Sequence, residues 1–159
     1  MPQTNRIFSD TAAPRNSVEV NTSNGRGSTN TVIRRFTTIK TSIGTAITYT
    51  DSATLGSTFT INESGVYSIT TVEGGNVTNG HIYAGISKNS VNLTTSIAVV
   101  PNTERLSAYG FNGTVGGSSF GTSTWTGPLA IGDVIRPHVI AEDPAIAADS
   151  MFIITKVSN

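Results

Sequence analysis

Hydrophobic and polar residues alternate along most of the chain after residue 30, as they do in β-strands with one buried face. In FTINESGVYSITT (59–71), for example, Phe59 and Ile61 alternate with polar residues before a turn, and Tyr67 and Ile69 resume the alternation after it. Many short strands at this spacing predict an all-β fold, an antiparallel sandwich or jelly roll of two sheets. Segments of this kind, separated by turns rich in glycine, asparagine and proline, predict strands over 31–41, 45–51, 57–62, 65–73, 79–89, 93–100, 104–113, 123–130, 133–142 and 150–157.

The first thirty residues show no sustained alternation. Two short apolar islands, Ile7-Phe8 and Val18-Glu19-Val20, stand among polar residues, and residues 21–30 (NTSNGRGSTN) have the composition of a flexible linker. A segment of this composition has too few apolar residues for a core of its own, so we expect it to lie along another surface. The sequence therefore predicts two parts, an extended N-terminal arm over 1–30 and a jelly-roll domain over 31–159.

The chain has no net charge, but its charges are unevenly distributed. Residues 1–40 hold six basic and two acidic residues, a net +4, and residues 41–159 hold four basic and eight acidic residues, a net −4. This asymmetry suggests that the basic segment has a partner of its own, and a chance excess on a solvated tail is the alternative. Nucleic acid is a poor candidate, because the arginines are dispersed and few aromatic residues lie among them. We therefore expect the arm to bind a protein through Arg6, Ile7, Phe8, Arg15 and Arg26.

Hydroxyl side chains dominate the composition. The 159 residues include 25 threonines and 18 serines, whereas 36% of the residues are apolar and 13% are charged. Threonine suits strands, because its β-branched side chain packs well on a pleated surface. There is no cysteine, so disulfides and thiolate metal sites are excluded. No apolar run is long enough to span a membrane, and the N-terminal residues lack the apolar region of a signal peptide.

The last predicted strand is apolar on both faces. In SMFIITKV (150–157), Met151 and Ile153 share one face, and Phe152 and Ile154 share the other. A strand of an antiparallel sheet normally has one face on the core and one in water, so this strand needs a second cover. The cover is either a loop of the same chain or a neighbouring subunit. We favour the subunit, with Met151 and Ile153 at the interface and the other pair in the core, or the reverse.

Four segments, taken in order, resemble the C1q and tumour-necrosis-factor-like jelly roll. A Phe-x-Ile strand followed by a short turn and Gly65-Val66-Tyr67 is similar to the signature of that family. GHIYAGISKNSVNL (80–93) resembles the following strand, GPLAIGDVIRPHV (127–139) resembles the entry to a late strand, and SMFIITKV resembles the closing strand. The resemblance implies a two-sheet jelly roll that assembles as a tight homotrimer, with the closing strand near the threefold axis. A ring of three also agrees with general rules of assembly, because one heterologous contact used three times closes on itself.

The style of the chain resembles that of tailed-bacteriophage virion proteins, in which such domains serve as capsid decoration (cement) proteins, head fibres and tail-fibre tips. We therefore expect a trimeric decoration protein on the capsid surface of the virion, made in the host cytoplasm, whose arm binds the major capsid protein. The alternative is a head- or tail-fibre tip module that binds a host-surface glycan or protein. An extended arm without contacts to its own jelly roll would favour the first reading, and an aromatic-lined groove at the apex would favour the second.

The sequence offers little catalytic chemistry, so we predict no enzyme, no cofactor and no metal site. The two histidines, His81 and His138, lie outside any metal-binding or hydrolase motif. Acidic residues within 142–149 are compatible with a glycosidase pair or a calcium site, but a solvated turn explains them better. Trp125 is expected in the core rather than in a sugar site, and a binding role for an apical loop around Tyr109 remains the less favoured alternative.

Overall fold

The computed structural model describes residues 15–75, 81–112, 119–140 and 149–159, and these form ten strands and one short 3-10 turn. In chain order the elements are β1 (Asn16–Arg26), β2 (Arg34–Ile43), β3 (Ile47–Ser52), β4 (Gly56–Ile61), β5 (Gly65–Gly75), β6 (His81–Lys88), the 3-10 turn η1 (Ile97–Val99), β7 (Arg105–Asn112), β8 (Ser119–Leu129), β9 (Val134–Pro137) and β10 (Met151–Ser158). The predicted all-β class is therefore confirmed.

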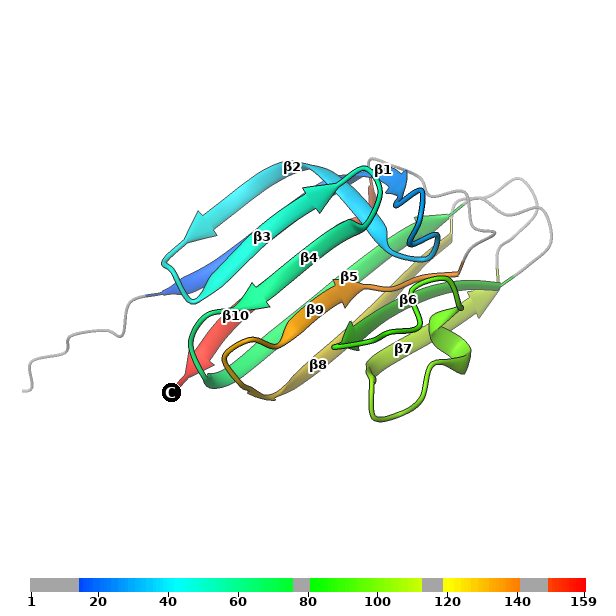
Figure 1. Ribbon diagram of the computed structural model, residues 1–159. Helices are drawn as coiled ribbons and strands as arrows, with labels where there is room; N and C mark the ends of the chain where they lie inside the picture. The colour runs from blue at the N-terminus through cyan, green and yellow to red at the C-terminus, as the bar shows by residue number, and fades with distance from the viewer. Residues whose placement is uncertain (1–14, 76–80, 113–118, 141–148) are drawn as a thin grey trace, which may run out of the picture.

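The strands form two antiparallel sheets that pack face to face, as in a jelly roll (Figure 1). Sheet 1 has the order β2-β1-β10-β5-β8, and sheet 2 has the order β3-β4-β9-β6-β7. Both β2 and β3 are edge strands on one side of the sandwich, and both β7 and β8 are edge strands on the other side. The closing strand β10 lies in the middle of sheet 1, between β1 and β5.

The core lies between the two sheets and is built from alternate residues of the facing strands. Phe59 of β4 and Phe152 of β10 are fully buried, and their rings stack across the sandwich with centroids 4.5 Å apart. The alternation in 59–71 has the expected result, because Ile61, Tyr67 and Ile69 are also buried. Burying one such side chain contributes about 1.5–3 kcal/mol, so these inward positions specify which face of each strand turns to the core.

The predicted boundary between an arm and the jelly roll is wrong, because residues 16–26 form an inner strand of sheet 1. Val18 pairs with Ile154 and Val20 pairs with Phe152, and both valines are buried in the core. The domain therefore includes residues from Asn16 onward. Only two apolar positions mark this strand in the sequence, and its stability comes from pairing with the next strand, β2, and with β10, which is far away along the chain. Residues 1–14 lie outside the described part.

The segment 93–100 is a loop with a single 3-10 turn and not the predicted strand. The Ser96 side chain accepts a hydrogen bond from the Ala98 amide and so caps η1. Ile97 is fully buried over Gly85 of β6, where any side chain on the glycine would collide with it. Ile97 thus packs on the outside of sheet 2, and the segment does not extend the sheet.

Candidate subunit interface

The closing strand presents Met151 and Ile153 on the outer face of sheet 1. Phe152 and Ile154 point into the sandwich and are fully buried, whereas Met151 and Ile153 are half-buried. Of the two arrangements expected from the sequence, the structure therefore has the one that places Met151 and Ile153 away from the core. Their burial by a second subunit remains a prediction.

The pairing of strands places further apolar side chains on the same outer face. Met151 lies opposite Val72 of β5, and Gly74, two residues further along β5, lies opposite Phe120 of β8. The ring of Phe120 lies over Gly74, which has no side chain to displace it, and Phe120 is 53% exposed. Phe120, Val72, Met151 and Ile153 together form an apolar strip, which we call the outer strip.

Hydroxyl groups surround the outer strip and leave the face almost uncharged. The Ser17 and Thr155 hydroxyls are 2.8 Å apart, and the Thr126 hydroxyl donates to Ser68 at 3.4 Å. Along the described outward positions of β10, β5, β8 and residues 17–21 of β1, the one charged side chain is Glu19, which lies opposite Ile153. Asp149, just before β10, also reaches this face, because its Cβ lies 2.9 Å from the position that a Cβ atom on Gly74 would occupy. Depletion of charge around an apolar centre is typical of the core of a subunit interface.

A second uncharged surface lies on the side of the sandwich where β7 and β8 are edge strands. The two strands are joined by a hydrogen bond of 2.6 Å from the Ser123 hydroxyl to that of Ser107. Tyr109 is 51% exposed and stacks with Phe111 at a centroid distance of 6.1 Å, and Phe111 in turn lies against Gly121. After Arg105, neither strand contains a charged residue. Long edge strands usually carry charges or are covered by a partner, so this side needs a cover.

On the opposite side of the sandwich, the edge strand β2 has features that usually prevent a free edge from pairing with another chain. Lys40 is the extra residue of a β-bulge in β2, where the register shifts between Glu19 and Val20 of the neighbouring strand. Charged residues and bulges on an edge strand oppose pairing with another chain. The described part of the molecule thus includes two different surfaces with little charge, the outer face of sheet 1 and the β7–β8 edge.

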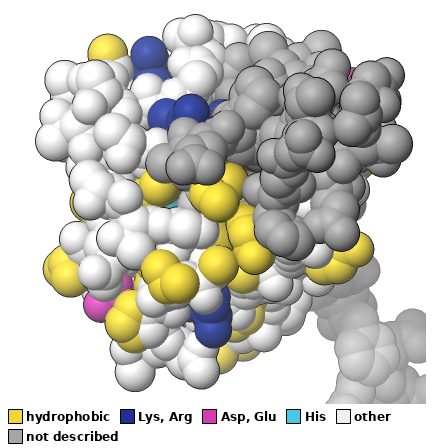
Figure 2. Space-filling model, turned by 90° about the vertical axis from the view of Figure 1, so that its right-hand side faces the viewer, with side chains coloured by type: hydrophobic (Ala, Val, Ile, Leu, Met, Phe, Trp, Pro, Cys, Tyr) yellow, Lys and Arg dark blue, Asp and Glu magenta, His cyan; other side chains and the backbone are white. Residues whose placement is uncertain are grey.

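One end of the molecule also exposes hydrophobic side chains. Figure 2 views the end that lies on the right in Figure 1 and shows hydrophobic groups gathered beside the grey residues. Val99 of η1 is 69% exposed, and η1 lies at this end of the ribbon in Figure 1. Exposed hydrophobic side chains of this kind would suit a module that binds a ligand.

The residues expected in an arm divide into three groups. Arg6, Ile7 and Phe8 lie outside the described residues. Arg15 is exposed and lines an open cavity of about 390 Å³ at the start of β1. Arg26 belongs to β1 and is half-buried, and its guanidinium Nη1 donates to the Ile140 carbonyl at 2.7 Å. The assignment of Arg26 to a free arm is therefore wrong.

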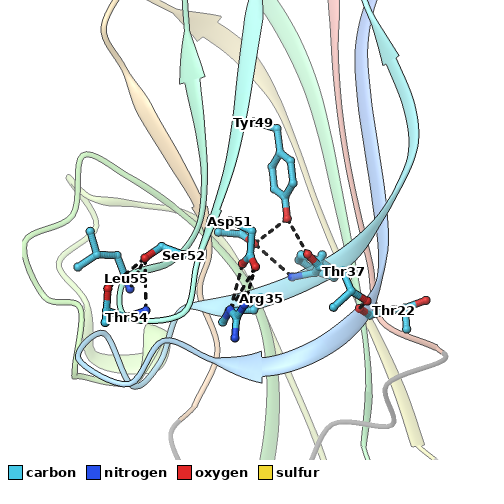
Figure 3. A network of polar contacts seen from close by, with 10 residues as sticks. Thr22, Arg35, Thr37, Tyr49, Asp51, Ser52, Thr54 and Leu55 are labelled. Atoms are coloured by element: carbon cyan, nitrogen blue, oxygen red, sulfur yellow. Dashed lines mark hydrogen bonds and ion pairs between the residues drawn. The ribbon is translucent and has the colours of Figure 1, made fainter.

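Much of the positive charge of residues 1–40 is used inside the domain. Arg34 and Glu73 form an ion pair in which each side chain is 1% exposed. Arg35 binds Asp51 through two nitrogens, with Nη2 at 2.7 Å and Nε at 3.2 Å, and this hydrogen bond raises the pKa of Arg35 (Figure 3). The charge asymmetry of the sequence thus reflects pairing between distant strands more than a basic arm.

The remaining candidates for chemistry are accounted for by the fold or lie outside it. His138 is fully buried under the 89–104 loop, its Nε2 lies 2.8 Å from the Thr95 carbonyl, and burial lowers its pKa. Trp125 packs against the core, as expected. Residues 142 and 143 are not described, and within the described chain no three His, Asp or Glu residues are grouped closely enough to hold a metal ion.

Sequence reasoning did not find Val72, Phe120 or the β7–β8 edge. The predicted strand over 104–113 is confirmed by β7, which contains Tyr109, so the alternative that placed Tyr109 in an apical loop is wrong. The signal in the sequence was the absence of charge from 106 to 130, which is unusual for two consecutive strands. No helix in the described ranges is long and apolar enough to cross a membrane.

Comparison with known proteins supports the fold. No protein-family profile matches the sequence, and no curated protein matches it. Among solved structures, the chain is similar to murine APRIL in a crystal structure at pH 5.0, with a TM-score of 0.62, 10% identity, and coverage of 90% of this chain and 99% of that chain. It is equally similar to Eiger TNF from S. frugiperda, with a TM-score of 0.62, 12% identity, and coverage of 92% and 95%. The chain therefore has a TNF-like jelly-roll fold.

Proposed function

We propose that this protein is a homotrimeric structural protein of a bacteriophage particle, which decorates the capsid shell. The observation that supports the trimer best is the outer face of sheet 1, where the outer strip lies among mostly uncharged side chains. The function is burial and bridging, without catalysis, cofactor or metal.

Two different surfaces with little charge on one chain suit a closed ring of three. A heterologous contact joins one patch to a different patch, and it forms a ring when the rotation closes. The outer face of sheet 1 and the β7–β8 edge provide such a pair. Each fully buried apolar side chain contributes about 1.5–3 kcal/mol, so the four residues of the outer strip form an adequate centre for such a contact.

The assignment to a capsid rests on the composition of the chain and on the residues that precede β1. Arg15 is exposed where the chain enters the domain, and Arg6 precedes it by nine positions. Arginine pairs well with carboxylates and carbonyls on a protein surface. Ile7 and Phe8 would be the apolar anchors of residues 1–15 on the major capsid protein. Arg26 has no part in this contact, because it is bonded within the domain.

A fibre-tip module that binds a host-surface glycan or protein is the second candidate. It is favoured by the exposed Tyr109, which stacks on Phe111, and by the hydrophobic end in Figure 2. Aromatic faces of this kind suit sugar rings. The two candidates differ in what residues 1–14 do, because a fibre tip needs them only as a connection.

Capture by particles tests the proposal. The purified chain should sediment at three times its 16.6-kDa mass and bind particles that lack it. Removal of residues 1–14 should leave the trimer intact, because β1 begins at Asn16, and should abolish capture. Phe8→Ala should weaken capture without a dependence on salt, and Arg6→Ala should reduce the salt dependence, because salt screens exposed ion pairs.

The matched control is Lys40→Ala, which removes an exposed charge from the edge of sheet 1. It should leave capture unchanged. If the truncated chain decorates particles as well as the full chain does, the capsid role is wrong and the fibre-tip candidate takes its place. A monomer in sedimentation would contradict the trimer.

A further inference from the structure

An open groove lies between β2 and β3, on the side of the sandwich opposite to the β7–β8 edge. Its volume is about 440 Å³. No charged side chain contributes to its walls, which combine apolar groups with hydroxyl and amide groups at the rim. The residues that line it are Ile39, Ser42, Gly44, Thr45, Ile47, Thr48, Tyr49 and Asn62.

The groove is an uncovered corner of the hydrophobic core. Ile39 pairs with Val20, a fully buried core residue, and paired residues on neighbouring strands share a face of the sheet. Ile39 nevertheless remains 55% exposed, whereas Ile47 across the groove is only 7% exposed. A core-facing isoleucine with half of its surface in water marks a place where an apolar group from elsewhere would gain free energy by binding.

Tyr49 provides a firm wall for the groove. Its hydroxyl donates to the Phe36 carbonyl at 2.9 Å and lies 3.0 Å from the Ser57 hydroxyl. Ser57 is in turn bonded to Asp51, which holds Arg35, so the ring belongs to a network that joins the two sheets (Figure 3). The site is therefore formed before anything binds to it.

The N-terminal segment leaves the domain at the end of this groove. Gly44, one of the lining residues, has a φ of +77°, and the Arg15 carbonyl oxygen lies 3.0 Å from the position that a Cβ atom on Gly44 would occupy. Residues 1–14 therefore begin next to the lining of the groove. Their large apolar side chains are Met1, Ile7 and Phe8, and the last two are adjacent.

We propose that in the free protein the groove binds Ile7 and Phe8 of the same chain. Phe8 precedes Arg15 by seven residues, which span up to about 23 Å when extended. Ile39 lies five residues from Gly44 along β2, or about 17 Å. The segment can thus turn back at Gly44 and reach Ile39. Because the residues that line the groove are uncharged, an apolar segment can bind there without removing a charged side chain from water.

The inference goes beyond the proposed function, because it concerns the protein before it meets a particle. The groove would bind the same two residues, Ile7 and Phe8, that are assigned to the capsid contact. Docking in the groove would keep them out of water in the free trimer, and transfer to the shell would release them. The test uses the free protein without particles. A negative result would therefore contradict docking in the groove, whereas the capsid role is decided by the separate capture experiment.

A nitroxide label on residue 9 tests the proposal in the full chain. The chain has no cysteine, so Ser9→Cys provides a single attachment point. With the label in place, the δ1-methyl NMR signals of Ile39 and Ile47 should lose intensity and recover when the nitroxide is reduced. The methyl signal of Ile69, which is fully buried on β5, is the internal reference and should be least affected.

The matched control adds Ile7→Ser and Phe8→Ser to the labelled chain. These changes should restore the Ile39 and Ile47 signals without altering the rest of the spectrum. Equal intensity loss with and without the serine substitutions, or no loss at all, would overturn the proposal. Mixed trimers of unlabelled isotope-enriched chains and labelled unenriched chains identify a different occupant. Loss of signal in those mixtures as well would mean that the segment of a second copy fills the groove, and the proposal for the same chain would be wrong; the proposal expects no loss there.

Discussion

The buried ion pair between Arg34 and Glu73 provides the sharpest test of how the two sides of sheet 1 are joined. Arg34 belongs to β2 and Glu73 to β5, and the sheet order places β1 and β10 between them. Each side chain is 1% exposed, and the Ser150 hydroxyl also donates to the Glu73 carboxylate at 3.4 Å. The pair therefore links strands that are not neighbours. We expect Arg34→Met to destabilise the protein strongly.

The magnitude follows from the burial of both groups. Arg34→Met removes the positive charge that contacts the buried Glu73 carboxylate. Loss of one partner of a buried pair typically costs about 3–5 kcal/mol. That is a large share of the 5–15 kcal/mol or so by which folded proteins are usually stable. Replacing both residues, as in Arg34→Met with Glu73→Leu, removes both charges, and we expect most of the lost stability to return.

Urea unfolding of the wild type, both single variants and the double variant measures the coupling. All four should be compared at one protein concentration, because the stability of an oligomer depends on it. The midpoint should fall in both single variants with an unchanged slope, since the surface exposed on unfolding is the same. The reasoning is refuted if Arg34→Met costs less than about 1 kcal/mol, or if the double variant loses the sum of the two single effects.

Two further predictions concern the subunit interface and the response to acid. Ile153→Asp places a carboxylate in the middle of the outer strip, so this variant should sediment as dissociated subunits. The control, Thr50→Asp on the exposed face of β3, should sediment as a trimer. An unchanged trimer of the Ile153→Asp variant would contradict the interface. Burial keeps the pKa of His138 below its ordinary value; the charge of Arg136 lowers this pKa further, and the charge of Glu104 raises it. As the pH falls, His138 therefore binds a proton in the unfolded chain before it does so in the folded protein. Stability should therefore decrease from about pH 6.5 downward, and this decrease should become shallower in His138→Gln, as measured by urea midpoints across pH. Equal slopes in both proteins would show that His138 is not responsible.

The alternation of apolar and polar residues was sufficient to predict most strands and the fold class. Phe59, Ile61, Tyr67 and Ile69 turned inward as their spacing indicated. The prediction failed where local spacing carried too little information. Val18 and Val20 give β1 only two apolar positions, and this strand exists because β2 and β10 pair with it on both sides. The apolar residues of 93–100 have the composition of a strand, but Gly85 leaves room for Ile97 on the outside of sheet 2.

For the candidate interface too, the sequence determined one part and the tertiary structure decided the rest. The sequence by itself determined that the closing strand is apolar on both faces, because alternation along one strand is a local property. Only the tertiary structure decided that Phe152 faces Phe59 while Met151 joins Val72 on the outside. It also placed Arg26 and Arg34 inside the domain, where the count of charges had suggested a free basic arm. The physical reason is that pairing between strands and between buried charges depends on residues far apart in the chain, which neither composition nor periodicity records.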